Sequence, residues 1–179
     1  MAYADPQSTH NPATGDIPPA AWGDVVRDDF EYLARNRPHF RAYNNANLSI
    51  PNNTFTAVTL NSERFDVGGM HSTASNTDRG TVPTGEAGKY SAWASGGFAA
   101  HATGVRIHAL YVNAATVIAN VRSESATDTT PEFIAYSPLY SLAAADYISF
   151  YTFQNSGGAL NLSATGNHTP EVSMMWECI

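Results

Sequence analysis

Short apolar runs separated by turn-forming residues are the feature of this sequence that most restricts its fold. From His39 to Ile179 such runs recur roughly every 10–15 residues, with Gly, Asn and Pro between them. No helical periodicity competes after Pro38, so the pattern predicts an all-β sandwich and not alternating helices and strands. The predicted strands are 39–44, 54–60, 63–66, 80–83, 89–98, 104–112, 115–122, 133–142, 146–154, 159–163 and 170–177.

Several predicted strands are apolar on both faces, whereas a half-exposed sandwich strand alternates apolar with polar residues. In the segment 148–153, Ile148 and Phe150 lie on one side, and Tyr151 and Phe153 lie on the other. The second face is either covered by another subunit or is an aromatic surface open to solvent. We expect a subunit interface. Its candidate residues are Tyr136, Tyr140, Phe150, Tyr151 and Phe153.

Residues 1–38 differ from the rest of the chain in composition and periodicity. Residues 1–17 are polar and broken by prolines, which is typical of an extended arm. Two prolines at 18–19 suit the first turn of a helix, and Pro38 ends it. The apolar face of this helix consists of Trp22, Val26, Phe30 and Leu33. We therefore expect an arm and an amphipathic attachment helix in 1–38 and one domain in 39–179.

The predicted helix has about five turns at most and is marginal alone in water, so its apolar face needs a partner. That partner is either the domain of the same chain or another protein, including a second copy of this chain. The sequence leaves both alternatives open.

The order of motifs within the predicted domain is distinctive. Residues 82–90 read VPTGEAGKY, residues 106–113 read RIHALYVN, residues 140–148 read YSLAAADYI, and a last strand-like run spans 171–176. This order resembles the jelly roll of the complement-globular-head and tumour-necrosis-factor superfamily. The resemblance covers residues 39–179 and implies a domain that forms trimers and binds partners but does not catalyse.

Shorter segments resemble bacteriophage virion proteins. These are residues 61–71 (NSERFDVGGMH) and 154–160 (QNSGGAL). The polar arm followed by Ala-Trp-Gly-Asp at 21–24 resembles the N-terminal attachment segment of small phage tail proteins. The resemblance implies a homotrimer on the surface of a virion, held to another virion protein through its N-terminus.

Two turns depart from the family pattern. Asn113-Ala114 stands where a tight Asn-Gly turn is expected, and Ala145-Asp146 stands where Gly-Asp is expected. A two-residue Asn-Gly turn needs positive φ, which alanine resists. We therefore expect a longer or different turn at Asn113.

The charge pattern excludes several partner classes. Charged residues make up only 14% of the chain, the net charge is -7, and no basic stripe is present, which indicates no nucleic-acid partner. The sequence has no apolar run of ~18 residues, so we expect no membrane insertion. The N-terminus lacks the basic start of a secretion signal, which disfavours a cytokine-like ligand. Cys178 is the only cysteine, so no intrachain disulfide can form.

Catalytic and cofactor motifs are also missing from the sequence. It contains no Gly-x-Ser-x-Gly, no His-Glu-x-x-His and no phosphate-binding glycine loop. His71 and Ser72 are adjacent, so an extended backbone points them to opposite faces. Acidic residues in the loops lack the spacing of a calcium loop. We expect no enzymatic activity, no cofactor and no metal.

Two functions remain for such a chain. The first is a tail-associated protein that binds a host-surface glycan or protein, and the second is a decoration protein on the capsid. We favour the tail because the predicted helix resembles tail attachment segments. The longest polar breaks, 66–79 and 123–132, are the expected receptor-facing loops. Their candidate residues are Asp66, His71, Asn76, Asp78, Arg79, Glu124, Asp128 and Glu132.

Overall fold

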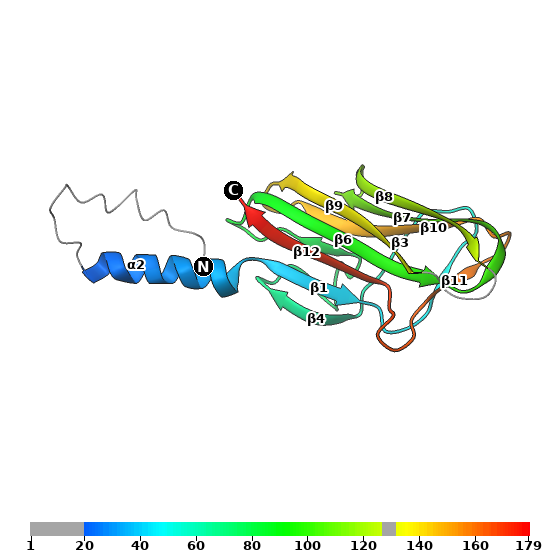
Figure 1. Cartoon of the computed structure of the whole chain (residues 1–179), viewed down its shortest axis with the longest axis horizontal. Coiled ribbons are helices and arrows are strands. Elements are labelled where there is room, and N and C mark those ends of the chain that lie inside the picture. The colour runs from blue at the N-terminus through cyan, green and yellow to red at the C-terminus, as the bar shows by residue number, and fades with distance from the viewer. Residues whose placement is uncertain (1–19, 127–131) are drawn as a thin grey trace. The chain divides into compact units, whose positions relative to one another are not determined.

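The computed structural model describes residues 20–126 and 132–179 (Figure 1). The chain divides into two compact units, residues 1–37 and 38–179, one residue before the boundary expected from the sequence. The carbonyl of Pro38 accepts a hydrogen bond of 2.9 Å from the backbone N–H of Trp176, which ties Pro38 to the second unit. This second unit is called the head below.

The first unit contains the predicted helix. Helix α2 (Ala20–Glu31) continues into a π-helical turn, η1 (Tyr32–Asn36). Arg37 then turns extended, with φ -56° and ψ 135°, the conformation favoured before a proline. No helix in the described ranges is long and apolar enough to cross a membrane.

The head is a sandwich of two antiparallel sheets that lie face to face (Figure 1). Sheet A has the order β4 (Ser62–Val67), β1 (His39–Tyr43), β12 (Glu171–Cys178), β6 (Gly88–Phe98) and β9 (Glu132–Leu142), and β11 (Leu160–Ser163) and β2 (Leu48–Ile50) extend it next to β6. Sheet B has β3 (Thr56–Ala57) and β5 (Arg79–Thr81) beside β10 (Tyr147–Gln154), followed by β7 (His101–Val112) and β8 (Thr116–Ala126).

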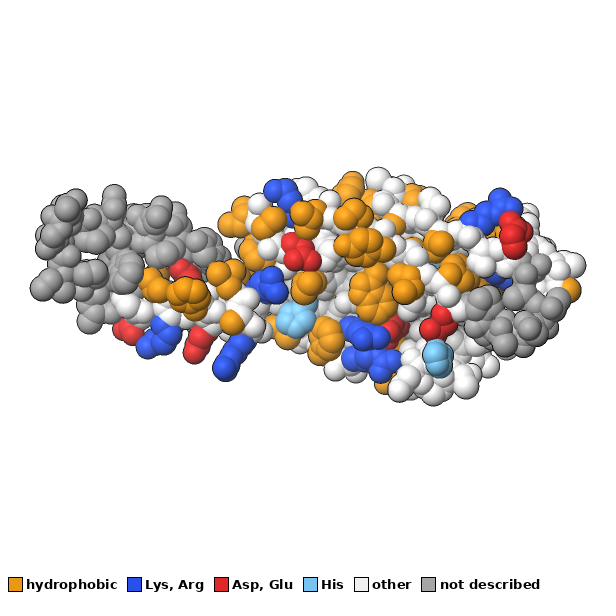
Figure 2. Space-filling model, in the orientation of Figure 1, with side chains coloured by type: hydrophobic (Ala, Val, Ile, Leu, Met, Phe, Trp, Pro, Cys, Tyr) orange, Lys and Arg blue, Asp and Glu red, His pale blue; other side chains and the backbone are white. Residues whose placement is uncertain are grey.

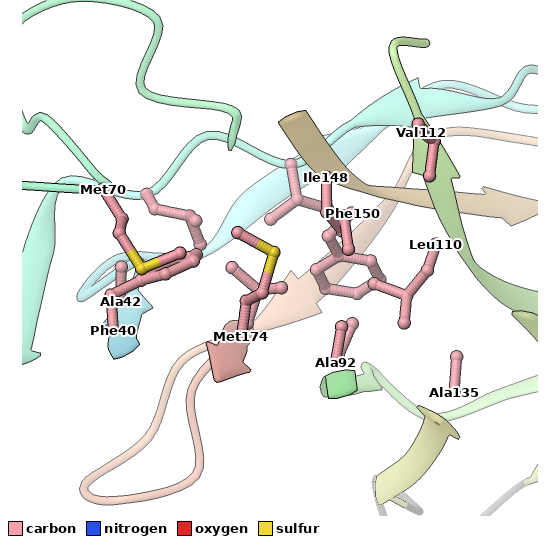
Figure 3. Close-up of a cluster of buried hydrophobic side chains, with 14 of the residues drawn as sticks. Phe40, Ala42, Met70, Ala92, Leu110, Val112, Ala135, Ile148, Phe150 and Met174 are labelled. Atoms are coloured by element: carbon pink, nitrogen blue, oxygen red, sulfur yellow. The ribbon is translucent and has the colours of Figure 1, made fainter. Parts of the chain in front are cut away.

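Alternating residues of both sheets fill the space between them. In Figure 3, Ile148 and Phe150 of β10 lie together with Met174 of β12, and all three are at most 1% exposed. Strand β5 passes so close to Phe40 that a Cβ on Gly80 would lie 2.0 Å from a ring carbon. The core therefore fixes which face of each strand points inward and leaves the other face outside the sandwich.

The all-β sandwich and the short N-terminal helix confirm the predicted fold class. Ten of the strands fall on predicted strand segments within a few residues, because their apolar alternation is local information. Strand β2 was not predicted, since its three residues give too short a pattern. The predicted strand 54–60 is reduced to the two residues of β3.

The turn after β7 is longer than a two-residue hairpin, as expected. Val112 pairs with Thr116, so three residues form the loop. The reason given for the longer loop was wrong, however, because Ala114 takes a positive φ of 53° beside Asn113 at 53°. Ala145 also has a positive φ, at 71°.

Candidate assembly interface

The outer face of sheet A, which points away from sheet B, carries aromatic and charged side chains in register. Arg41 of β1 pairs with Ser173 of β12, which pairs with Trp93 of β6, which pairs with Tyr136 of β9. On the other side Arg41 pairs with Phe65 of β4. One row of side chains therefore crosses five strands.

The β9 end of this face is an exposed apolar stripe. Ile134, Tyr136 and Leu139 are 59%, 58% and 56% exposed. We call these three residues the β9 stripe. Figure 2 shows hydrophobic side chains spread over this side of the head, with basic side chains gathered near β1 and β4. A run of large exposed apolar residues on one strand is typical of an interaction surface.

The opposite end of the face is built around Glu171. Its carboxylate, 5% exposed, accepts a hydrogen bond from Nη2 of Arg41 and one of 2.7 Å from Nε of Arg64. The guanidinium groups also stack on aromatic rings, with Cζ of Arg41 5.0 Å from the Trp93 ring and Cζ of Arg64 4.8 Å from the Tyr43 ring. The hydrogen bond to Glu171 raises the pKa of Arg64.

A β-bulge positions Arg64 for this contact. Ala42 pairs with Glu63 and Arg41 pairs with Phe65, so Arg64 is the extra residue of β4. Two guanidinium groups share one carboxylate, which leaves excess positive charge on this side of sheet A. We call Arg41, Arg64 and Phe65 the arginine patch, and Phe65 is 43% exposed.

The predicted interface residues do not share one face. Phe150 is 0% exposed and belongs to the core, so its assignment to an interface was wrong. Tyr151 and Phe153 lie on the outer face of sheet B, because their neighbours Phe150 and Thr152 point into the sandwich. Tyr140 packs against the core. Tyr136 alone lies in the β9 stripe.

The sequence signal for Arg41, Arg64, Glu171 and Trp93 was weak. Alternation in β1 places His39, Arg41 and Tyr43 on one face, but nothing local identifies their partner. Glu171 is 130 residues away from Arg41 along the chain. Only the order of strands in the sheet brings them together.

The first predicted receptor loop, 66–79, is partly structural. The Asp66 carboxylate accepts backbone hydrogen bonds of 2.9 and 3.0 Å from Met70 and His71. The His71 ring is fully buried, lies 2.8 Å from a Glu63 oxygen and stacks on Phe40. This burial removes His71 as a receptor contact and also as a base for Ser72.

Other members of this loop remain at the surface. Asp78 and Arg79 pair through two hydrogen bonds of 3.1 and 3.2 Å. Asn76 adopts a positive φ of 50° and lines a hollow of about 150 Å³.

The described parts of the second predicted loop, residues 123–126 and 132, belong to strands. Glu124 lies in β8 and pairs with Arg122 at 3.1 Å. Glu132 begins β9 and pairs with His168 at 3.1 Å, beside a hollow of about 280 Å³. Asp128 lies outside the described residues.

The predicted attachment face is exposed where the structure describes it. Phe30 is 68% and Leu33 is 42% exposed, and Val26 is half-buried. The side chain of Trp22 lies outside the described residues. Among the described residues, no group of three His, Cys, Asp or Glu side chains could hold a metal ion.

His108 lies in the middle of strand β7 and joins the two sheets. Its Nε2 lies 3.1 Å from the carbonyl of Gly96 in sheet A, and its Nδ1 lies 2.9 Å from the hydroxyl of Thr152 in sheet B. The ring stacks on Phe133 at 3.8 Å. Complete burial lowers the pKa of His108 to about 4.

No family model and no curated protein sequence matches this sequence. The structure is nevertheless similar to solved structures. The crystal structure of murine APRIL at pH 5.0 superposes with a TM-score of 0.56 at 14% identity, over 79% of this chain and 99% of that chain. The head is a tumour-necrosis-factor-like jelly roll. Murine APRIL at pH 8.0 and at pH 8.5 each give a TM-score of 0.52 at 13% identity over the same shares. At this level of identity the similarity shows the fold alone.

Proposed function

We propose that this chain is a non-enzymatic virion structural protein that forms a homotrimer through sheet A. Its N-terminal segment attaches it to a bacteriophage tail, and its jelly-roll head binds the host surface. The β9 stripe is the observation that carries the proposal, because three neighbouring side chains more than half exposed need a covering surface. The phage location rests on the resemblance of segments 21–24, 61–71 and 154–160.

The two ends of sheet A support a head-to-tail contact. The β9 stripe is apolar, whereas the arginine patch combines positive charge with the exposed ring of Phe65. Tyrosine and arginine are the side chains that most often anchor interfaces. In our proposal the β9 stripe of one copy covers the arginine patch of the next, and repetition of one contact between unlike surfaces closes a ring. Three copies are the number implied by the jelly-roll family.

The N-terminal helix supports attachment to another protein. Phe30 and Leu33 expose an apolar face on a helix too short to be stable alone. Docking of this face onto a carrier protein buries both side chains and stabilises the helix. The head then keeps its own surfaces free for other contacts.

Counting the protein in purified particles tests the tail location. A few to a few dozen copies per particle are expected, because tails hold few attachment positions. Hundreds of copies would contradict the tail location and indicate a decoration protein on the capsid.

Incorporation tests the attachment helix. Phe30→Asp places a charge in the docking face and is expected to abolish incorporation into particles, while Asp28→Asn on the exposed helix surface leaves it normal. Normal incorporation of Phe30→Asp would contradict attachment through this face.

A further inference from the structure

The outer face of sheet B carries a row of aromatic rings that the assembly proposal does not use. Tyr147, Tyr151 and Phe153 alternate along β10 with side chains that point into the sandwich. Tyr111 of β7 lies 4.6 Å from Tyr151 between ring centroids, and Phe55 lies 5.0 Å from Phe153. We call these five residues the aromatic shelf. From Tyr147 to Phe153 the strand rises about 20 Å.

A polar hollow adjoins one end of the aromatic shelf. Ser72, Ser75, Asn76, Arg79 and Thr81 contribute to its lining, and its volume is about 150 Å³. Thr81 pairs with Tyr147 across the sheet, and the guanidinium of Arg79 lies 4.1 Å above the Tyr147 ring. Arg79 therefore lines the hollow and also contacts the shelf. The hollow is smaller than the roughly 300–1,000 Å³ of pockets for drug-sized ligands, which suits a single sugar residue.

Asp78 holds the guanidinium of Arg79 in place. Nε and Nη2 of Arg79 donate to the two carboxylate oxygens, and the side chains are 23% and 27% exposed. Among the described residues, the Arg79 guanidinium and the Asp78 carboxylate have no other hydrogen-bond partner, so their remaining N–H groups and lone pairs can hydrogen-bond a ligand. A donor and an acceptor fixed side by side match two neighbouring hydroxyl groups of a sugar.

The charge of this face selects against acidic ligands. Arg79 is neutralised by Asp78, and Arg122, across the sheet from Ile107, is neutralised by Glu124 at 3.1 Å. The whole chain carries a net charge of -7, which repels acidic polymers. An uncharged ligand with apolar ring faces and many hydroxyl groups complements this surface.

We propose that the aromatic shelf and its hollow bind a neutral glycan chain. One sugar residue occupies the hollow beside Arg79, whose guanidinium Asp78 holds in place, and the following residues lay their C–H faces on Tyr147, Tyr151 and Phe153. Tyrosine and tryptophan rings suit such a contact because they combine apolar faces with polar edges. This inference deepens the proposed host-binding role by naming the site and the class of ligand.

Binding is tested with the purified full-length protein on a printed array of neutral and acidic oligosaccharides. The strongest neutral oligosaccharide is then titrated in solution by calorimetry, so that the affinity per subunit is measured. We expect Tyr151→Ala and Phe55→Ala to weaken this affinity by about tenfold or more, as for loss of an aromatic anchor. Asp78→Asn is expected to weaken it as well while leaving the sheet intact.

Phe65→Ala is the matched control. Phe65 and Phe55 are 43% and 44% exposed, but Phe65 lies on sheet A. We expect its glycan affinity per subunit to equal that of the wild type. Circular dichroism checks that every variant is folded.

Three results would overturn the glycan site. They are an array without any neutral ligand, binding restricted to acidic glycans, and unchanged affinity in folded Tyr151→Ala and Phe55→Ala. If these two variants changed the mass of the protein oligomer in solution, the result would indicate a protein contact on this face and would also overturn the glycan site. The glycan assay needs neither phage particles nor trimer assembly, so its failure can be told apart from failure of the proposed function. If the protein is incorporated normally into particles but binds no glycan on the array, only this inference is contradicted. If a monomer binds the glycan, only the proposed trimer is contradicted.

Discussion

At the scale of single residues, Ala145 holds a backbone angle that alanine resists. Its φ of 71° lies in the left-handed region, which costs a non-glycine residue about 1–2 kcal/mol. Glycine removes this cost, but its greater conformational entropy in the unfolded chain offsets part of the gain in stability. We expect Ala145→Gly to raise the free energy of unfolding by about 0.5–1 kcal/mol in chemical denaturation. Ala144→Gly in the same turn is the control and should lower it.

The buried ion cluster gives a second residue-scale prediction. Glu171→Gln keeps the shape of the side chain but leaves Arg41 and Arg64 without a counter-charge. We expect the free energy of unfolding to fall by about 2 kcal/mol or more, because Glu171 is almost completely buried. Glu124→Gln breaks the exposed pair with Arg122 and should change it by less than about 0.5 kcal/mol. Equal effects of the two variants at the same protein concentration would contradict this account.

His108 predicts how stability depends on pH. Its pKa of about 4 in the folded state lies below the ordinary value of 6.5, so the unfolded chain binds more protons between these values. The stabilising contribution of neutral His108 is present above pH 6.5 and is lost as pH falls toward 4. The total loss in the free energy of unfolding is about 3 kcal/mol. We expect His108→Gln to show a smaller loss of stability over this interval than the wild type. His101→Gln changes an exposed histidine and should follow the wild type.

At the scale of elements, the sequence predicted most of what local patterns control. Strands β6, β7, β9, β10 and β12 lie where apolar alternation placed them. The face of each strand that is covered was harder to predict, because the residues of β10 are apolar on both sides. Phe150 was expected in an interface and fills the core, since only the position of the second sheet decides which side is inside.

The division at Arg37 and Pro38 predicts that the head folds without the helix. Residues 38–179 contain the complete core cluster, and its buried residues start at Phe40. We expect a chain of residues 38–179 to keep the β-type circular dichroism spectrum and a cooperative thermal transition, and to lose only attachment to particles. A non-cooperative transition would show that the N-terminal unit completes the core.

At the scale of the whole molecule, the sequence indicated candidate residues for a subunit interface but not the face of the head on which each one lies. Of these candidates, Tyr136 alone lies in the β9 stripe on the outer face of sheet A. Trp93, Arg41, Arg64 and Glu171 were missed because a row across five strands joins residues far apart in the chain. The predicted loops were likewise chosen for polarity, although His71 and Asp66 use their polar groups within the head.

The head-to-tail contact between the β9 stripe and the arginine patch makes a prediction that only complementary variants can test. Light scattering of the wild type should give three times the 19.2 kDa mass of one chain. Tyr136→Asn damages the β9 stripe by replacing its aromatic ring with a small polar group, and Arg64→Glu damages the arginine patch. Each variant alone should be monomeric because every contact in the ring uses both surfaces. An equimolar mixture retains one intact stripe and one intact patch, so it should form a heterodimer that cannot close into a ring. If Arg64→Glu alone assembled, the stripe would be pairing with itself. A wild-type monomer at micromolar concentration would contradict the assembly altogether.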